Sequence, residues 1–357
     1  MRALLPRRRR QVLALVDLVQ DIDVLLPALL VIRNSPDLGL KILVSAWLER
    51  ESPRTAAILR AHRLPFAFVR RREIIEGRQP SLRGVAAVLA ASESSHPAHA
   101  GGHALARRAS GLGIRTYALQ HGFEQIGLFG PEAAQAEFAS QTVFCWFPEA
   151  AAPADLPAET RQKLAPVGRP APPGGWSRDP VATFDLGVFE NLHWDRYGDQ
   201  EREGFLRGLT AVAQVLPHLR ILLRPHPAGG WADQIGHELA PFENIVRPSA
   251  QETRANLDGG AQILRGLSRV ITTPSTVALD AALAAAPVAL AAPGGASYQP
   301  VPVLADPQAW VAFASGESYD EAVLDQFRSR VLVEGDGAPR IVERLRRDLV
   351  QTMAVLP

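Results

Sequence analysis

A short turn in the second half of the chain carries an arginine and a histidine in a setting suited to phosphate. Residues 220–227 read Arg-Ile-Leu-Leu-Arg-Pro-His-Pro, an apolar strand that ends in Arg224 and His226. Pro225 and Pro227 flank His226, restrict the backbone on both sides and hold the imidazole in a defined direction. A cation or hydrogen-bond donor held at a strand end can bind a phosphate. The alternative is a turn histidine that satisfies local carbonyl groups.

A second turn offers hydroxyl groups at the start of a helix. Residues 272–276 read Thr-Thr-Pro-Ser-Thr and follow an apolar strand. Ser275 is a favoured residue type for the N-cap of a helix that begins at Thr276. The free N–H groups of such a helix start bind anions, and both hydroxyls would add to them. The alternative is plain helix capping, which can coexist with phosphate binding.

A polar cluster follows the first strand of the second half. Residues 189–197 include two acids, an amide, a histidine and three aromatic residues. Glu190, Asn191 and His193 could contact a sugar or phosphate group of a ligand. Trp194 and Tyr197 could stack on a base or sugar, or pack under the next helix. These residue types at a strand end predict a ligand contact.

The first half has a comparable turn at Gln120-His121-Gly122, directly after a strand. Gly122 permits a tight backbone, so His121 would point away from the strand end. His121 is therefore a candidate functional residue. The alternative is a buried histidine bonded to a backbone carbonyl.

Two acids follow other strands of the first half. Glu93, in the sequence Ser-Glu-Ser-Ser, is a candidate general acid, general base or nucleophile. Capping by Ser94 or Ser95 is the competing interpretation of that segment. Asp17 could face an acceptor substrate, although N-capping of the next helix would also explain it. The sequence therefore predicts His121, Glu93 and Asp17 as catalytic candidates and leaves their order open.

A metal site is not expected. His96, His99 and His103 have a spacing that suggests ligands on one helix. Pro97 and the glycines at 101–102 would interrupt that helix, so the three rings would not align. The chain holds one cysteine, Cys145, which excludes a disulfide framework and a cysteine-rich zinc site.

These residues lie between elements that alternate along the chain. The apolar runs and helical periodicity predict a parallel sheet covered by helices in each half. Strands are expected at 11–18, 40–45, 66–69, 84–90, 115–119, 142–147, 184–189, 220–223, 245–246, 269–273 and 288–291. Helices are expected at 21–33, 53–62, 98–110, 200–216, 231–238, 276–285, 320–327 and 339–353.

Length and motifs exclude several protein classes. The 357 residues suffice for two domains, and the net charge of +1 argues against a basic nucleic-acid surface. The Walker A, dinucleotide-binding, nucleophile-elbow and H-E-x-x-H motifs are absent.

Acidic residues interrupt the first apolar stretch, so no membrane span is expected there. The arginine run at residues 7–10 is interpreted as a solvated leader before the first strand, with weak attraction to an anionic leaflet as the alternative.

The two phosphate-type turns resemble those of GT-B glycosyltransferases. The His-Pro turn and the later Ser/Thr turn are similar to those of capsule and lipopolysaccharide Kdo transferases, bacterial sialyltransferases and CDP-glycerol glycerophosphotransferases. In those families the matching residues contact donor phosphate, which implies this role for His226, Pro227, Ser275 and Thr276. The His-Gly turn at His121 resembles a turn of capsule and teichoic-acid polymer transferases, which implies that His121 is a base or an acceptor contact.

The resemblance implies an α/β protein of the GT-B class, with two Rossmann-like domains that face each other across a cleft. We expect an acceptor-binding domain at 1–170, a Pro/Gly linker at 171–180, a donor-binding domain at 181–335 and a closing helix at 336–357. Arg224, Glu190, Asn191 and His193 would complete the donor site.

The expected activity is metal-independent transfer of Kdo or a related nonulosonic acid from a cytidine-nucleotide donor, without a cofactor. The acceptor would be a surface polysaccharide or lipopolysaccharide. The alternatives are a CDP-glycerol-type phosphotransferase, a UDP-sugar transferase or 2-epimerase, and a non-catalytic binding homologue. We expect a cytoplasmic protein, either free or peripheral on the inner face of the bacterial inner membrane. Its expected partners are a nucleotide-sugar donor and a glycan or glycolipid acceptor rather than nucleic acid.

Overall fold

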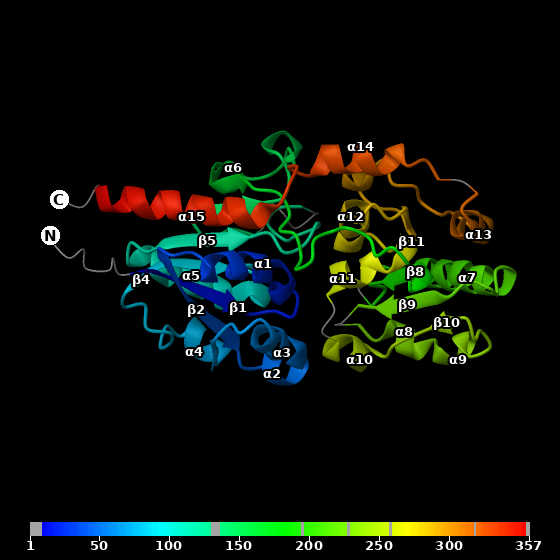
Figure 1. Cartoon of the computed structure of the whole chain (residues 1–357), viewed down its shortest axis with the longest axis horizontal. Coiled ribbons are helices and arrows are strands. Elements are labelled where there is room, and N and C mark those ends of the chain that lie inside the picture. The colour runs from blue at the N-terminus through cyan, green and yellow to red at the C-terminus, as the bar shows by residue number, and fades with distance from the viewer. Residues whose placement is uncertain are drawn as a thin grey trace. The chain divides into compact units, whose positions relative to one another are not determined.

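The chain divides into two compact units. A computed structural model describes residues 9–129, 136–193, 196–226, 229–256, 259–317 and 319–354. Unit 1 comprises Met1–Pro173 together with Leu332–Pro357, and unit 2 comprises Gly174–Val331. Each unit is a parallel sheet with helices on both faces, and Figure 1 labels these elements.

The described part of unit 1 forms a seven-stranded sheet in the order β3-β2-β1-β4-β5-β6-β7. All neighbouring strands pair in parallel. The strands are β1 (Arg10–Val16), β2 (Leu38–Ser45), β3 (Phe66–Val69), β4 (Val85–Ala90), β5 (Arg115–Leu119), β6 (Thr142–Cys145) and β7 (Leu164–Pro166).

The helices of unit 1 cover both faces of this sheet. They are α1 (Asp21–Arg33), α2 (Leu48–Glu51), α3 (Pro53–Ala61), α4 (Arg71–Ile75), α5 (Ala100–Gly111), α6 (Ala158–Lys163) and α15 (Gly337–Ala354). Helix α1 packs beside α15, and α4 beside α5. Because both faces are covered, the central strand β1 is buried at every residue from Val12 to Val16.

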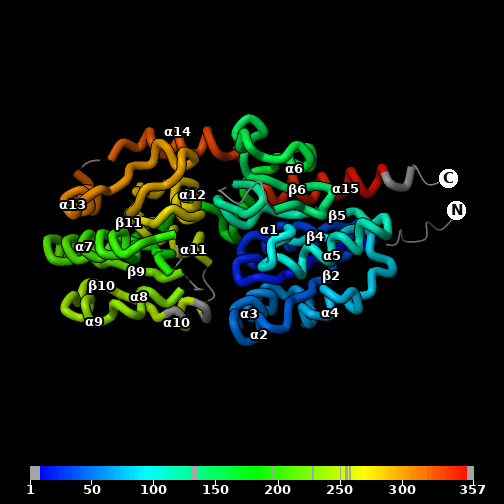
Figure 2. The backbone as a smooth tube through the Cα atoms, turned by 180° about the vertical axis from the view of Figure 1, so that it is seen from behind, coloured from blue at the N-terminus to red at the C-terminus, as the bar shows by residue number. Residues whose placement is uncertain are grey.

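Unit 2 contains a five-stranded parallel sheet in the order β10-β9-β8-β11-β12. Its strands are β8 (Phe184–Glu190), β9 (Ile221–Pro225), β10 (Ile245–Val246), β11 (Leu267–Thr272) and β12 (Val288–Leu290). Its helices are α7 (Asp199–Val215), α8 (Trp231–Gln234), α9 (Gly236–Leu239), α10 (Ala250–Ala255), α11 (Gly260–Arg265), α12 (Thr276–Leu283), α13 (Pro307–Ser315) and α14 (Ala322–Val331). Figure 2 follows the same path from behind.

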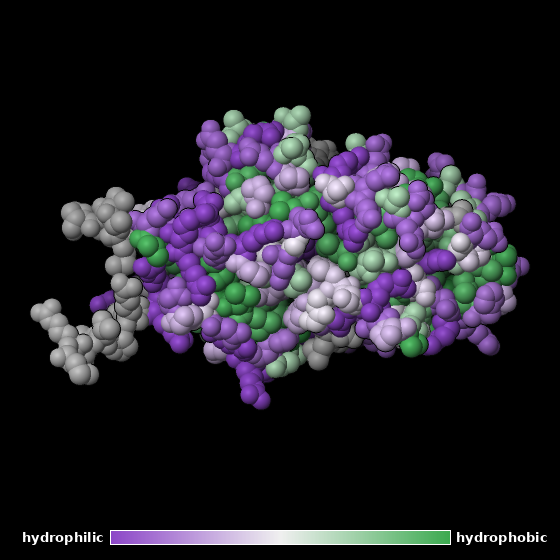
Figure 3. Space-filling model, turned by 45° about the horizontal axis from the view of Figure 1, so that its top comes forward, coloured by the Kyte–Doolittle hydropathy of each residue, from purple (hydrophilic) through white to green (hydrophobic). Residues whose placement is uncertain are grey.

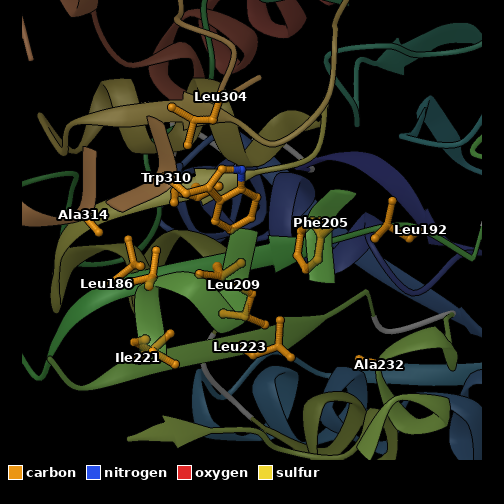
Figure 4. Packing of buried hydrophobic residues seen from close by; sticks show 14 of the residues in the cluster. Leu186, Leu192, Phe205, Leu209, Ile221, Leu223, Ala232, Leu304, Trp310 and Ala314 are labelled. Carbon is orange, nitrogen blue, oxygen red and sulfur yellow. The ribbon is translucent and has the colours of Figure 1, made fainter. Parts of the chain in front are cut away.

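One large apolar cluster holds unit 2 together on the α7 face of its sheet. The indole of Trp310, on α13, lies against the ring of Phe205 with centroids 5.3 Å apart. Figure 4 shows Trp310 among leucines of the sheet and of α7. Gly208 makes this approach possible, because a Cβ there would lie 2.5 Å from the indole. The cluster anchors α7, which follows the polar cluster at residues 189–197.

Chain order reverses at one point in each sheet. In unit 2 the chain runs from β8 outward to β9 and β10, and then returns to the other side of β8 as β11. In unit 1 the corresponding point lies between β1 and β4. Ligands of such open sheets bind beyond the carboxyl ends of the strands at this reversal. The candidate residues therefore belong to the loops that follow β1, β4, β5, β8, β9 and β11.

Most predicted elements are confirmed, with shifted ends. Helix α1 has the predicted bounds, whereas the helix expected from residue 98 begins at Ala100, after a 3₁₀ turn over Pro97–His99. Helices α10, α11 and α13 had no counterpart in the sequence prediction. Among the helices that the structure describes, none combines the length and apolarity of a membrane span.

Candidate functional site

The loops after β8, β9 and β11 meet at one edge of the unit 2 sheet. The strand register places Phe189 opposite both Arg224 and Thr272, and Glu190 opposite Pro225. The next residues of the three strands therefore leave the sheet side by side. We call this region the unit 2 edge.

Two histidines stack at the unit 2 edge, although they follow different strands. The rings of His193 and His226 lie 4.9 Å apart between centroids with an interplanar angle of 28°. Burial, and then the neighbouring His193, lower the pKa of His226 to about 4, and burial also lowers the pKa of His193. Both rings are therefore neutral near pH 7, which favours hydrogen bonding over charge neutralisation at phosphate. Pro227 and Trp194 lie outside the described residues.

Ser275 caps α12, as its residue type predicts. Its Oγ accepts a hydrogen bond from the N–H of Val277 at 3.2 Å and lies 3.1 Å from the Oγ1 of Thr272. Ser275 and Thr276 are both partly exposed. The helix start is thus open to solvent while its cap is already formed, and phosphate binding there stays a prediction.

The segment after β8 is fastened to the segment after β11. The N–H of Asn191 donates to the Oγ1 of Thr273, and its Nδ2 donates to the carbonyl of Pro274, both at 3.1 Å. The Oε2 of Glu190 accepts from the N–H of Leu192 at 2.8 Å. These bonds give the loop a fixed shape, so the position of Glu190 is set by backbone groups.

Glu190 and Asn191 each keep one buried oxygen without a hydrogen-bond partner in the described part of the chain. These are the Oε1 of Glu190 and the Oδ1 of Asn191. The two side chains belong to residues that are 3% and 5% exposed. Burial raises the pKa of Glu190 to about 7, so its carboxyl group is partly protonated near neutral pH. This group can accept or donate a proton at the unit 2 edge.

The structure adds two residues that the sequence interpretation left without a role. The guanidinium of Arg196 donates to the carbonyl of Pro274 at 2.8 Å. Asp280 lies on α12 and is only 5% exposed. Two features of the sequence could have identified them: Asp280 is an acid in an otherwise apolar helix, and Arg196 lies within the polar cluster at residues 189–197. Tyr197, by contrast, packs in the apolar core of unit 2, as its alternative interpretation predicted.

His121 lies at the corresponding edge of the unit 1 sheet, after β5. The ring Nδ1 of His121 lies 3.3 Å from the carbonyl oxygen of Ala91. The backbone N–H of His121 donates to the Oε1 of Gln125 at 2.7 Å. A carbonyl only accepts, so this contact places the proton on Nδ1 and leaves Nε2 as an acceptor. Burial lowers the pKa of His121 to about 4, so the ring is neutral. This tautomer suits a general base.

Glu93 is fully buried and braces two loops of unit 1. Its carboxylate accepts from the N–H groups of Ala139 and Ser140, both at 3.0 Å, and lies 2.8 Å from the Nδ1 of His103. These contacts occupy both carboxylate oxygens. A catalytic role for Glu93 stays a prediction, whereas its positioning role is visible.

The serines beside Glu93 do not cap the following turn. Ser94 lies 2.7 Å from the Nδ1 of His99, and the Oγ of Ser95 accepts from the N–H of Glu137. The capping acceptor is His96, whose Nδ1 accepts from the N–H of Ala98 at 3.2 Å. Capping by Ser94 or Ser95 was therefore wrong, because neither hydroxyl accepts from an N–H group of the turn: Ser94 contacts the His99 ring and the N–H of His96, and Ser95 bonds to Glu137.

Asp17 is also buried within a polar network. Its carboxylate accepts from the hydroxyl of Ser45 and lies 3.1 Å from the Nε of Arg71. Burial raises the pKa of Asp17, and that of Asp21, to about 6. The first turn of α5 lies so close that a Cβ at Gly101 would be 2.5 Å from the Oδ2 of Asp17. A catalytic role for Asp17 stays a prediction.

The histidines of residues 96–103 bond to different partners. His99 contacts Ser94, and His103 contacts Glu93. Within the described residues, no set of three or more His, Cys, Asp or Glu side chains could hold a metal ion.

Comparisons with known proteins find similarity in structure but not in sequence. No protein-family model and no curated protein matches the chain. A putative UDP-N-acetylglucosamine 2-epimerase from Listeria monocytogenes superposes with a TM-score of 0.68 over 94% of this chain and 95% of that chain, at 12% identity. The UDP-GlcNAc 2-epimerase from Neisseria meningitidis, bound to UDP-GlcNAc, has a TM-score of 0.63 over 94% of this chain and 100% of that chain, also at 12% identity.

Glycosyltransferases share the architecture as well. A spinosyn rhamnosyltransferase superposes with a TM-score of 0.57 at 13% identity, over 96% of this chain and 100% of that chain. Two all-parallel sheets with these connections, and near-complete superposition on enzymes of both kinds, establish the architecture. The chain has the GT-B fold.

Proposed function

We propose that the protein is a nucleotide-sugar enzyme that transfers a sugar from a uridine diphosphate sugar to a hydroxyl acceptor. The observation that carries this proposal is the unit 2 edge, where the His193–His226 stack and the N-terminus of α12 follow adjacent strands. Neutral imidazoles, a serine hydroxyl and helix N–H groups are donors suited to a diphosphate. Glu190 and Asn191 supply the buried oxygens that sugar or ribose hydroxyls would bond.

Uridine replaces cytidine as the preferred base. The structural neighbours include one described as bound to UDP and one bound to UDP-GlcNAc. They support the UDP-sugar alternative better than a CMP-Kdo or CDP-glycerol donor. The turns at His226 and Ser275 would bind phosphate, which is common to cytidine and uridine donors, so these two motifs do not discriminate between the bases.

His121 is the side chain of unit 1 that we assign as general base. In the transfer, Nε2 of His121 would accept the acceptor hydroxyl proton, and the oxygen would form a bond to the anomeric carbon. The bond between that carbon and the diphosphate would break, and UDP would leave with the electron pair. Neutral donors at the unit 2 edge would stabilise the leaving phosphate oxygens. No step requires an oxidant or reductant.

Epimerisation at C2 of a UDP-sugar is the second candidate. Its support is the similarity to several 2-epimerases, of which one superposes with a TM-score of 0.68. Transfer is favoured because the buried carboxylates of unit 1 are engaged: Glu93 by two N–H groups and Asp17 by Ser45 and Arg71. His121 has an acceptor nitrogen available for an acidic hydroxyl.

A turnover experiment distinguishes the two. The full-length protein is incubated with UDP-GlcNAc, with and without glycan acceptors, and followed by ¹H and ³¹P NMR. Transfer predicts UDP release that depends on the acceptor. The C2 epimer without UDP release would establish the epimerase instead. If every UDP-sugar tested remains unreacted, alone and with acceptors, this result would contradict both transfer and epimerisation. It would favour a non-catalytic nucleotide-binding protein.

A further inference from the structure

The edge of the unit 1 sheet at which its strands begin carries many exposed arginines. Parallel strands all start at this edge, and the helices that return antiparallel to them end there. We define the basic edge as the following exposed residues: Arg9, Arg33, Arg60, Arg63, Arg83, Arg107 and Arg347. It lies at the opposite end of the sheet from Asp17, Glu93 and His121.

Contacts in the structure connect neighbouring elements along this edge. The guanidinium of Arg33 donates to the carbonyl of His62, the residue before Arg63. The neighbouring Arg346 pairs with Asp37 at 3.1 Å, and the carbonyl of Asp37 accepts from the N–H of Arg10 at the start of β1. The strands β3, β2, β1, β4 and β5 lie side by side, so their starts span roughly 20 Å.

The charge of the basic edge is not neutralised locally. Within the described part of the chain, none of its seven arginines forms an ion pair with a carboxylate. Helix dipoles favour cations in the last turn of a helix, which accounts for Arg33 and Arg60. They do not account for Arg9 and Arg83, which precede strands. The whole chain has a net charge of only +1, so this excess is a local feature.

An apolar side chain projects among these cations. Leu112 is 65% exposed and lies in the turn between α5 and β5. Gly111 and Gly113 flank it, and neither has any neighbouring atom within 4 Å of a built Cβ, so the turn projects into open space. Val350, on α15, is 57% exposed. Figure 3 shows hydrophilic residues gathered over this end of unit 1.

We propose that the basic edge docks the protein on an anionic lipid bilayer, with Leu112 entering the interfacial layer. Lipid phosphates would bind the guanidinium groups, which carry several donors each. An exposed leucine surrounded by cations fits the boundary between headgroups and acyl chains better than the polar groove of a nucleic acid. This interaction is independent of nucleotide binding, since it uses the opposite end of the sheet.

Vesicle sedimentation of the full-length protein tests the proposal. One set of vesicles contains phosphatidylcholine alone, and the other contains about one part phosphatidylglycerol to three parts phosphatidylcholine. The first variant carries Arg33→Glu, Arg63→Glu and Arg107→Glu. Its matched control carries Arg50→Glu, Arg178→Glu and Arg207→Glu, which are exposed arginines outside the basic edge. Thermal melts verify that both variants fold, and an Arg→Gln version replaces any that does not.

The proposal predicts salt-sensitive binding to the anionic vesicles. The basic-edge variant should bind at least about tenfold more weakly, and the control within about twofold of the original protein. Leu112→Ser should weaken binding several-fold without changing its salt dependence. Equal losses in the two triple variants, or no vesicle binding at low salt, would overturn the proposal. Binding to duplex DNA or RNA through the same arginines without vesicle binding would overturn it in favour of a nucleic acid.

Discussion

The rings of His193 and His226 stack 4.9 Å apart at the end of the unit 2 sheet, although 33 residues of sequence numbering separate them. The β8–β9 register brings the two loops together, and Gly229 makes room for the stack. A Cβ at Gly229 would lie 2.5 Å from the Nδ1 of His193. The pair therefore depends on strand register and on one small residue.

Gly229→Ala should disrupt the stack and weaken nucleotide binding. The methyl group must displace the His193 ring, and we expect about a tenfold loss of UDP affinity, measured by titration calorimetry. Gly230→Ala is the matched control, since a Cβ there has nothing within 4 Å. Unchanged affinity in the Gly229 variant would show that the stack does not contact the nucleotide.

Substitutions of Ser275 separate helix capping from phosphate binding. Ser275→Ala removes the cap and should lower the free energy of unfolding by about 1 kcal/mol. Ser275→Asp retains a capping acceptor but adds a negative charge, so stability should persist while nucleotide affinity falls at least about tenfold. Ser249→Asp, at the N-cap of α10, serves as the control. Tight UDP binding by Ser275→Asp would place the phosphate elsewhere.

Loss of His121 should abolish turnover and leave nucleotide binding intact. His121→Ala removes the proposed base, and we expect the rate constant kcat to fall about 10²- to 10⁴-fold. The dissociation constant for UDP should stay within about twofold, because the proposed nucleotide contacts belong to unit 2. His62→Ala is a control in unit 1 remote from the site. A normal kcat in the His121 variant would eliminate this residue as the base.

His99 should make stability depend on pH. Burial, followed by the nearby His121, lowers the pKa of His99 to about 3, against an ordinary value of 6.5. Between these pH values the unfolded chain binds a proton that the folded chain does not, so acidification below pH 6.5 destabilises the fold. His99→Gln removes this contribution and can still bond Ser94.

The measurement is chemical denaturation of both proteins at pH 6.5 and 4.5. Between pH 6.5 and pH 4.5, the free energy of unfolding of the original protein should fall by on the order of 2 kcal/mol more than that of the variant. Equal losses would mean that His99 titrates at its ordinary pKa in the folded chain. Asp17, Asp21 and Glu190 shift in the opposite direction, but they contribute equally to both proteins.

The sequence predicted the elements that local patterns define. Helix α1 has acids in its first turn and an arginine in its last, and its bounds were predicted correctly. Helix α13 was missed, although Asp306 caps it and Pro307 occupies its first turn. Its packing depends on Trp310 fitting over Gly208, about a hundred residues earlier, and no local window contains that contact.

In the candidate site, too, local features were predictable from the sequence, and features that depend on distant contacts were not. Ser275 was predicted as an N-cap from its type and position, and it is one. The role of Glu93 as a brace could not be predicted, because its partners Ala139 and Ser140 lie more than forty residues away. The stacking of His193 on His226 required the strand register. Sequence spacing identified the chemical groups, and the sheets decided which of them meet.

Titration of UDP into the full-length protein tests the proposed nucleotide site, with CMP, CDP and GDP as competitors and His226→Ala as the variant. We expect preferential UDP binding that weakens at least about tenfold in His226→Ala. We expect no loss of UDP affinity in His218→Ala, which changes an exposed histidine of unit 2. Preference for CMP or CDP would restore the cytidine donor. No nucleotide binding by the folded protein, or equal binding by His226→Ala, would contradict the assignment of the unit 2 edge.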